Sequence, residues 1–125
     1  RALWGGYVIH TPSGKIYFAG DTGYGPFVED IRKRVGKIRL GLLPIGAYIP
    51  RSFSRNHIDP FEAVRIHQQL GAELSIPMHY GTFRQSAEGY TQPVEDLRKA
   101  LEEYKLPQSA FMVLSEGETW QGFAP

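Results

Sequence analysis

Two segments of the sequence place a potential metal ligand directly after an apolar, strand-like run. Asp21 follows residues 15–20, and His79 follows residues 74–78, with a glycine nearby in each case that lets the backbone turn sharply. In α/β sheets, ligand sites cluster beyond the carboxyl ends of strands. A carboxylate and an imidazole held at two such ends are ligands that a hydrolytic metal centre uses. Two ligands do not complete a closed site, so the others must come from elsewhere.

Each of these side chains also has a simpler interpretation. Asp21 stands in Gly-Asp-Thr-Gly, a sequence that favours a turn, and Asp-Thr-Gly is also the signature of aspartic proteases. Those proteases are nearly all β, and the three helices expected below argue against them. His79 taken alone could be a hydrogen-bonded core histidine. The pairing of the two residues at the ends of two strands favours a metal site, with Asp21 and His79 as the ligands.

The remaining histidines differ in their setting. His57 lies just before Asp59, a candidate helix N-cap, where an imidazole could contact a substrate or relay a proton, or could simply be a surface group. His67 falls on the apolar face of the following helix and is expected to be a buried structural residue. His10 lies beside a turn and is expected to be solvated.

Residues 46–58 form a long predicted loop that carries arginine and aromatic side chains. Tyr48 and Arg51 belong to it, and an arginine beside aromatic rings could hold a phosphate next to an apolar tail. Both could equally be ordinary exposed residues.

The elements that must position these residues alternate between strand and helix. We expect strands at residues 2–10, 15–20, 39–45, 74–78 and 111–114, with a short last strand at 119–120, and helices at residues 26–35, 59–71 and 93–105. The middle helix has clear boundaries, with Asp59 as N-cap, Pro60 in the first turn, Glu62 as the capping-box partner and Gly71 at the end. The pattern predicts an α/β fold with a mixed sheet and about three helices.

Composition limits the possible functions. The 125 residues suit one domain, the net charge is +1 with scattered basic residues, and 42% of the residues are hydrophobic. No basic cluster indicates nucleic-acid binding, and no apolar run is long enough to span a membrane. The chain has no cysteine, so a metal would have to bind His, Asp or Glu. We expect a reducing, cytoplasmic location, with peripheral membrane association compatible with a lipid substrate.

Several predicted strands are apolar on both sides, although one layer of helices can cover only one face of a sheet. The other face must therefore meet a missing segment or another chain, such as a second copy in a homodimer. The sequence also opens directly into an apolar run, Ala2-Leu3-Trp4, without a polar lead-in. Both features lead us to expect a chain cut from a longer protein.

Four motifs occur in an order that points to one family. They are Phe18-Ala19-Gly20-Asp21-Thr22-Gly23-Tyr24, Leu43-Pro44-Ile45-Gly46-Ala47-Tyr48, His57-Ile58-Asp59-Pro60 and His79-Tyr80-Gly81-Thr82-Phe83. Together they resemble the metallo-β-lactamase-fold hydrolases, and within them the branch of N-acyl-phosphatidylethanolamine-hydrolysing phospholipase D. The resemblance covers nearly the whole chain.

The resemblance implies an αββα sandwich of two similar halves with a binuclear zinc site between the sheets. It assigns Asp21 to the carboxylate that bridges both metals, His79 to a histidine on one of them, and His57 to a non-ligand histidine near the reacting phosphate. The family's His-x-His-x-Asp-His motif does not occur in this sequence. Residues 1–125 therefore resemble the C-terminal half of such a domain, with the N-terminal half as the expected partner.

From this resemblance we expect a zinc-dependent phosphodiesterase of phospholipase D type, in which Asp21 and His57 are catalytic and Tyr48, Arg51 and His57 contact a phosphodiester lipid. The chain alone is expected to bind zinc weakly and to be inactive. Two alternatives stay open at this point: a metal-dependent lactonase of the sugar-phosphate lactonase branch, and a non-catalytic α/β binding module.

Overall fold

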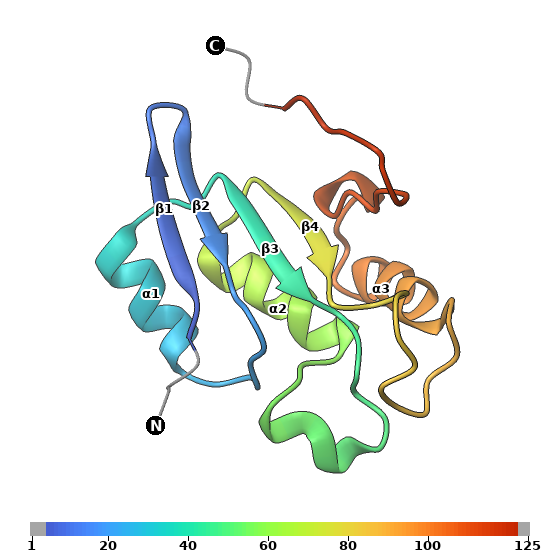
Figure 1. The fold of residues 1–125 in the computed structure, drawn as a ribbon. Coiled ribbons are helices and arrows are strands. Elements are labelled where there is room, and N and C mark those ends of the chain that lie inside the picture. Colours follow the sequence, from blue (N-terminus) through green and yellow to red (C-terminus); the bar gives the residue numbers. More distant parts are fainter. Residues whose placement is uncertain (1–4, 123–125) are drawn as a thin grey trace.

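A four-stranded mixed sheet forms the centre of the molecule. The computed structural model describes residues 5–122. β1 (Tyr7–Thr11) and β2 (Gly14–Phe18) form an antiparallel hairpin, and β3 (Leu40–Pro44) and β4 (Leu74–Met78) extend the sheet in parallel, in the order β1-β2-β3-β4. Figure 1 shows that β2, β3 and β4 point in the same direction. The expected mixed sheet is confirmed.

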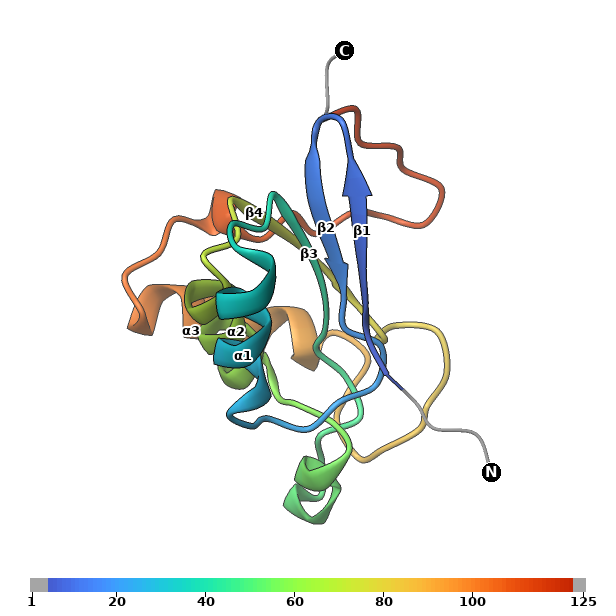
Figure 2. The ribbon, with the colours of Figure 1, turned by 90° about the vertical axis from the view of Figure 1, so that its left-hand side faces the viewer.

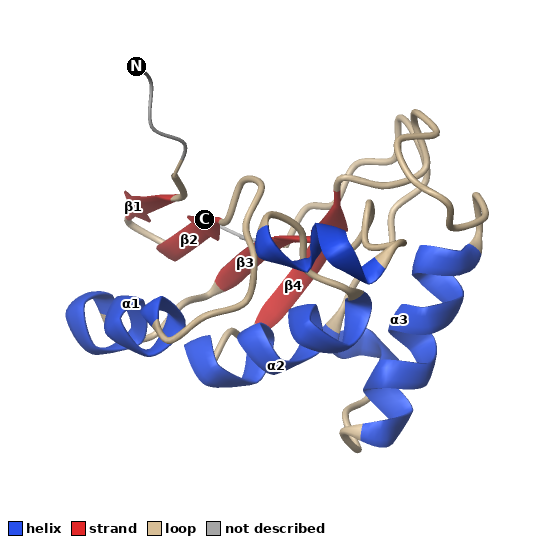
Figure 3. Cartoon of the chain, turned by 90° about the horizontal axis from the view of Figure 1, so that it is seen from below, coloured by secondary structure: helices blue, strands red, loops and turns tan. Residues whose placement is uncertain are grey.

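The three α-helices of the described residues lie on one side of this sheet. They are α1 (Phe27–Val35), α2 (Pro60–Leu70) and α3 (Gln92–Glu103). Figures 2 and 3 show two layers, one of strands and one of helices. The predicted α/β class with about three helices is confirmed. In the described part of the chain, no helix combines the length and the hydrophobicity that crossing a membrane requires.

The boundaries of α2 follow from its own sequence. The Asp59 side chain accepts a hydrogen bond from the Glu62 N–H at 2.8 Å, and the Glu62 carboxylate accepts one from the Asp59 N–H at 3.1 Å. This is the predicted capping box, with Pro60 in the first turn. Gly71 ends the helix with φ 60°, a left-handed conformation that glycine adopts without steric cost.

The core lies between the sheet and the helices. Leu43 of β3, Val64 of α2 and Leu101 of α3 are almost completely buried there. His67 is also buried, as predicted, and its Nδ1 lies 2.8 Å from the Ser75 hydroxyl oxygen of β4. Burial lowers the pKa of His67, because desolvation penalises the charged imidazolium.

The face of the sheet opposite the helices is apolar as well. Residues paired in register point to the same face, and the pairs Tyr7↔Phe18, Phe18↔Leu42 and Leu42↔Ile76 form one row across all four strands. Ile9 belongs to the next row, and Tyr7 and Ile9 are 68% and 50% exposed. We refer to these rows as the open sheet face.

Two predicted strands near the C-terminus are wrong. Residues 111–114 form only an isolated parallel bridge between Phe111 and Ser75, with a hydrogen bond from Met112 N–H to the Ser75 carbonyl at 2.8 Å. The next ladder bond on this edge of β4 would need the N–H of Pro77, which proline lacks, so the pairing stops. Residues 119–120 form no strand.

Two other boundaries differ from prediction. β1 begins at Tyr7 instead of residue 2, and residues 2–4 lie outside the described part of the chain. The predicted loop 46–58 contains a short 3-10 helix, η1 (Arg51–Arg55), that precedes His57.

Candidate metal centre

Asp21, His57 and His79 come from three separate segments that meet at one edge of the sheet. Asp21 follows β2, His79 follows β4 directly, and His57 lies between η1 and α2. Because β2 and β4 run parallel, their C-terminal ends reach the same side of the molecule, where the loop carrying η1 also lies (Figure 1). The sheet thus places the carboxylate and the imidazole next to each other, as the sequence predicts.

The three side chains are close enough to share a ligand. His79 Nε2 lies 3.4 Å from Asp21 Oδ1. The rings of His57 and His79 stack with their centroids 5.3 Å apart and an interplanar angle of 20°. One possible ligand atom from each residue lies within 4.8 Å of the other two. The Asp21 side chain is 59% exposed, so this arrangement is not a buried salt bridge.

Two glycines permit the backbone approaches that bring these segments together. A Cβ on Gly46, just after β3, would overlap the carbonyl oxygen of His79. A Cβ on Gly23, just after Asp21, would overlap the carbonyl oxygen of Arg55 at the end of η1. Gly46 therefore allows the end of β3 to pack on His79, and Gly23 allows the Asp21 loop to pack on the segment that leads to His57.

Strained backbone marks the same place. His79 has φ 60° and Ala47 has φ 64°, values in the left-handed region that residues with a Cβ rarely adopt. Such strain persists only where the surroundings hold it, and it is concentrated at functional sites. The direction of the His79 side chain is therefore fixed by the fold instead of by a local preference.

The donor atoms fit a zinc ion. One carboxylate and two imidazoles match the oxygen and nitrogen ligands of catalytic zinc, which commonly has three protein ligands. Nδ1 of His57 and Nδ1 of His79 are both buried and have no hydrogen-bond partner within residues 5–122. Buried polar atoms are normally satisfied, so an unpaired nitrogen on each ring is consistent with a site that acquires further groups. The structure places His57 in the same cluster as the two predicted ligands, and its expected role beside the substrate stays a prediction.

Tyr48 and Arg51, which we predicted as substrate contacts, lie outside this cluster. The Tyr48 hydroxyl donates a hydrogen bond to Asp96 Oδ2 of α3 at 2.7 Å. Burial, followed by this bond and the nearby carboxylates, raises the pKa of Tyr48 far above its ordinary value. Arg51 is exposed on η1, and its charge acts on Glu62. Substrate contact by either residue stays a prediction.

A cavity of about 420 Å³ opens beside His79. Its lining includes Gly46, Tyr80, Phe83 and Tyr90. Phe83 and Tyr90 are 79% and 69% exposed, so the residue 80–90 loop presents aromatic rings next to the metal cluster. The ring faces offer an apolar surface for a substrate group.

Sequence reasoning missed Glu88, which also lines this cavity. Its carboxylate holds the backbone of the Ala47 turn, as described below. No spacing in the sequence links Glu88 to a turn that is 41 residues away. Only the packing of the two loops reveals the contact.

Comparison with known proteins agrees with this geometry. The family model described as the beta-lactamase superfamily domain matches residues 1–80. The chain therefore belongs to the β-lactamase superfamily, with the metallo-β-lactamase fold that the four motifs indicate.

Hydrolases are among the proteins to which the chain is similar. It is 34% identical over 123 residues to N-acyl-phosphatidylethanolamine-hydrolyzing phospholipase D 1 of Caenorhabditis elegans, which covers 95% of this chain and 35% of the relative. It is 37% identical over 119 residues to a UPF0173 metal-dependent hydrolase of Aeropyrum pernix, covering 93% and 43%. The chain thus spans less than half the length of these relatives.

Solved structures confirm the fold. The isothiocyanate hydrolase from Delia radicum gut bacteria superposes with a TM-score of 0.73 at 19% identity, over 95% of this chain and 44% of that one. At this identity the likeness concerns the fold alone. The match again covers less than half of the solved chain.

Proposed function

We propose that this chain supplies one side of the active site of a zinc-dependent hydrolase, with the other side contributed by the half of the fold that the comparisons leave unmatched. The observation that carries the proposal is the convergence of Asp21, His57 and His79 within 4.8 Å at the C-terminal ends of parallel strands. The superfamily match and the metal-dependent hydrolase among the relatives support it.

In this proposal each side chain has a definite task. Bound zinc would supply a water of lowered pKa and would neutralise charge on the substrate oxygens. Asp21 has two carboxylate oxygens and its side chain is open to solvent, so each oxygen could contact a metal ion. The surrounding fold holds the backbone of His79 in its left-handed conformation, from which the imidazole extends toward Asp21. His57 stacks on that ring and can hydrogen-bond a substrate oxygen or join the ligand set.

The open sheet face is the proposed contact with the rest of the domain. Its exposed members, among them Tyr7, Ile9 and Phe18, form an apolar surface of the kind that other protein covers. We propose residues 1–125 as the C-terminal half of the metallo-β-lactamase domain, paired through this face with an N-terminal half that brings the remaining ligands. A homodimer through the same face would leave the metal site without those ligands.

The proposed substrate is a phosphodiester lipid of the N-acyl-phosphatidylethanolamine kind, cleaved in the manner of a phospholipase D. The similarity to a protein named for this activity supports the choice, as do the aromatic rings beside His79. Exposed Arg51 on η1 is the proposed contact for the phosphate, because a guanidinium pairs with phosphate oxygens in a bidentate manner.

The test uses the complete protein that carries this chain. Asp21→Ala should lower zinc stoichiometry and reduce hydrolysis of N-acyl-phosphatidylethanolamine vesicles to below about one hundredth, since even residues that only support metal ligands give losses of 10–100-fold. Asp30→Ala, on the exposed side of α1, is the matched control and should change neither.

The outcomes separate the candidate functions. Full activity in Asp21→Ala refutes the assignment of Asp21. Turnover of a sugar lactone in place of the lipid favours the lactonase alternative. The absence of stoichiometric zinc in the unsubstituted protein favours a non-catalytic module.

A further inference from the structure

The carboxylate of Glu88 accepts two backbone hydrogen bonds from a single turn. Ala47 N–H donates to Oε1 at 2.6 Å, and Ile49 N–H donates to Oε2 at 3.2 Å. Ala87 N–H returns a bond to the Ile49 carbonyl at 3.0 Å. Partial burial by itself would raise the pKa of Glu88, but these bonds, with those from a neighbouring serine and its own backbone, outweigh burial and lower it. Glu88 is therefore ionised at neutral pH and can accept from both amides.

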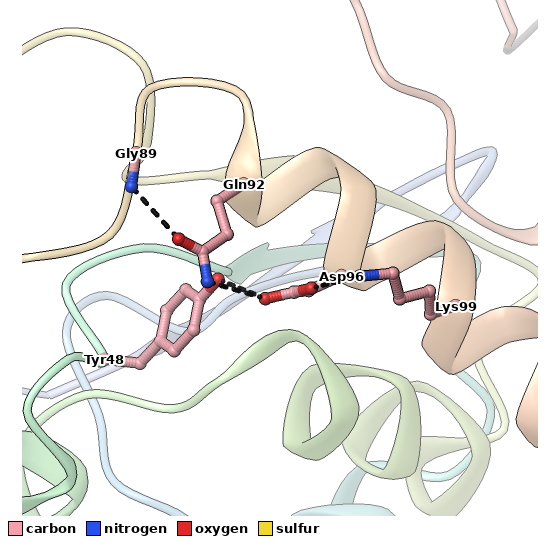
Figure 4. A network of polar contacts seen from close by, with 5 residues as sticks. All are labelled: Tyr48, Gly89, Gln92, Asp96 and Lys99. Atoms are coloured by element: carbon pink, nitrogen blue, oxygen red, sulfur yellow. Dashed lines mark hydrogen bonds and ion pairs between the residues drawn. The ribbon is translucent and has the colours of Figure 1, made fainter.

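The beginning of α3 anchors both partners of this contact (Figure 4). Gly89, next to Glu88, donates its N–H to Gln92 Oε1 at 3.1 Å. Tyr48, between the two clamped amides, donates to Asp96 Oδ2 at 2.7 Å, and Lys99 pairs with the other Asp96 oxygen at 3.2 Å. Glu88 thus holds the backbone of the turn at residues 46–49, and Asp96 of α3 holds the Tyr48 side chain of the same turn.

The clamped turn packs directly on the backbone of His79. Ile45 N–H donates to the Met78 carbonyl at 3.0 Å, so β3 and β4 stay paired up to this point. The following Gly46 lies so close to the His79 carbonyl that no Cβ would fit between them. Ala47, which follows Gly46, and His79 are both left-handed, so a strained residue lies at or next to each side of this contact. A strained pair of this kind keeps its conformation only if something outside it is rigid.

We propose that Glu88 is a positioning residue, which sets the direction of the His79 imidazole by clamping the turn at residues 46–49 against the His79 backbone. The inference rests on the proposed function in that it takes His79 as a metal ligand. Glu88 lies nine residues after His79 in the same connection between β4 and α3, and its carboxylate accepts its bonds from the Ala47 and Ile49 amides, not from a residue of the metal cluster.

Glu88→Gln is the sharpest test, because glutamine has the same shape but only one acceptor oxygen. One of the two amides would then face an NH₂ group and lose its bond. In the complete protein we expect faster hydrogen exchange at the Ala47 and Ile49 amides, a shifted His79 amide resonance, and zinc affinity about 10–100-fold weaker, as for other residues that support metal ligands. Unchanged exchange in α2 would show that the fold is intact.

Glu95→Gln is the matched control. It removes the same charge from the exposed side of α3 and should leave all three measurements at their wild-type values. The proposal is overturned if Glu88→Gln leaves the His79 resonance and the zinc affinity unchanged, whether or not the two amides exchange faster. It is also overturned if zinc affinity falls while both amides keep their protection. If the unsubstituted protein binds no zinc, the proposed function fails, and the His79 resonance alone decides the role of Glu88.

Discussion

Replacing Gly46 with alanine is a direct test of how the sheet positions the metal cluster. The substitution adds one methyl group where the end of β3 meets the backbone after β4. That methyl carbon would lie well inside 3.0 Å of the His79 carbonyl oxygen, a separation that real Cβ atoms essentially never show, and 3.2 Å from Tyr80 Cα. Every atom concerned belongs to backbone, so no side-chain rotation can relieve the overlap.

The size of the effect follows from this geometry. Restoring an ordinary contact requires a backbone shift of about 1 Å, and forcing an extra methyl group into a packed site costs about 1–3 kcal/mol. Because the segment that must move includes His79, its imidazole moves as well. A misplacement of about 1 Å in a catalytic group lowers activity by about 10²-fold. The loss of activity should therefore exceed what the loss of stability explains, and the urea denaturation curve measures the folded fraction separately.

The measurements are urea denaturation, zinc titration and hydrolysis, all on the complete protein. Gly5→Ala is the matched control, since a Cβ at Gly5 would meet no atom of residues 5–122 within 4 Å. It should change the free energy of unfolding by no more than about 0.5 kcal/mol, as a surface substitution does. Wild-type stability and wild-type zinc affinity in Gly46→Ala would refute the view that this close approach holds His79 in place.

Three further substitutions test separate contacts. Asp59→Ala removes half of the capping box and should lower the free energy of unfolding by about 1 kcal/mol in urea denaturation, with no loss if the Glu62 contact is irrelevant. Burial lowers the pKa of His67 in the folded state, so stability is complete above the unfolded-state pKa of about 6.5 and falls as pH drops below it. His67→Asn, which can still bond to Ser75, should flatten the stability profile between about pH 7 and 5.5, and an unchanged slope would contradict this. Tyr48→Phe should lower the free energy of unfolding by about 1.5–3 kcal/mol, because the hydroxyl bonds to a carboxylate; a raised KM with no change in stability would instead identify Tyr48 as a substrate contact.

The sequence alone determined the features that depend on neighbouring residues. The capping box of α2 needs only Asp59 and Glu62 three positions apart, and the structure has it as predicted. The parallel ends of β2 and β4 follow from alternating strands and helices, so Asp21 and His79 could be expected to converge. Burial of His67 followed from its helical position. The strand expected at residues 111–114 does not form, because Pro77 in the edge strand β4 has no N–H to continue the pairing.

Only the tertiary structure decided the contacts between loops. Three such contacts join segments far apart in the chain. His57 stacks on His79, the Tyr48 hydroxyl bonds to Asp96 of α3, and the Glu88 carboxylate bonds to the Ala47 amide. No residue pattern encodes them, because they depend on where packed strands and helices leave the loops in space. Gly46 shows the difference. The sequence places it at the start of a predicted loop, but only the structure shows that a side chain at this position would overlap the His79 carbonyl oxygen.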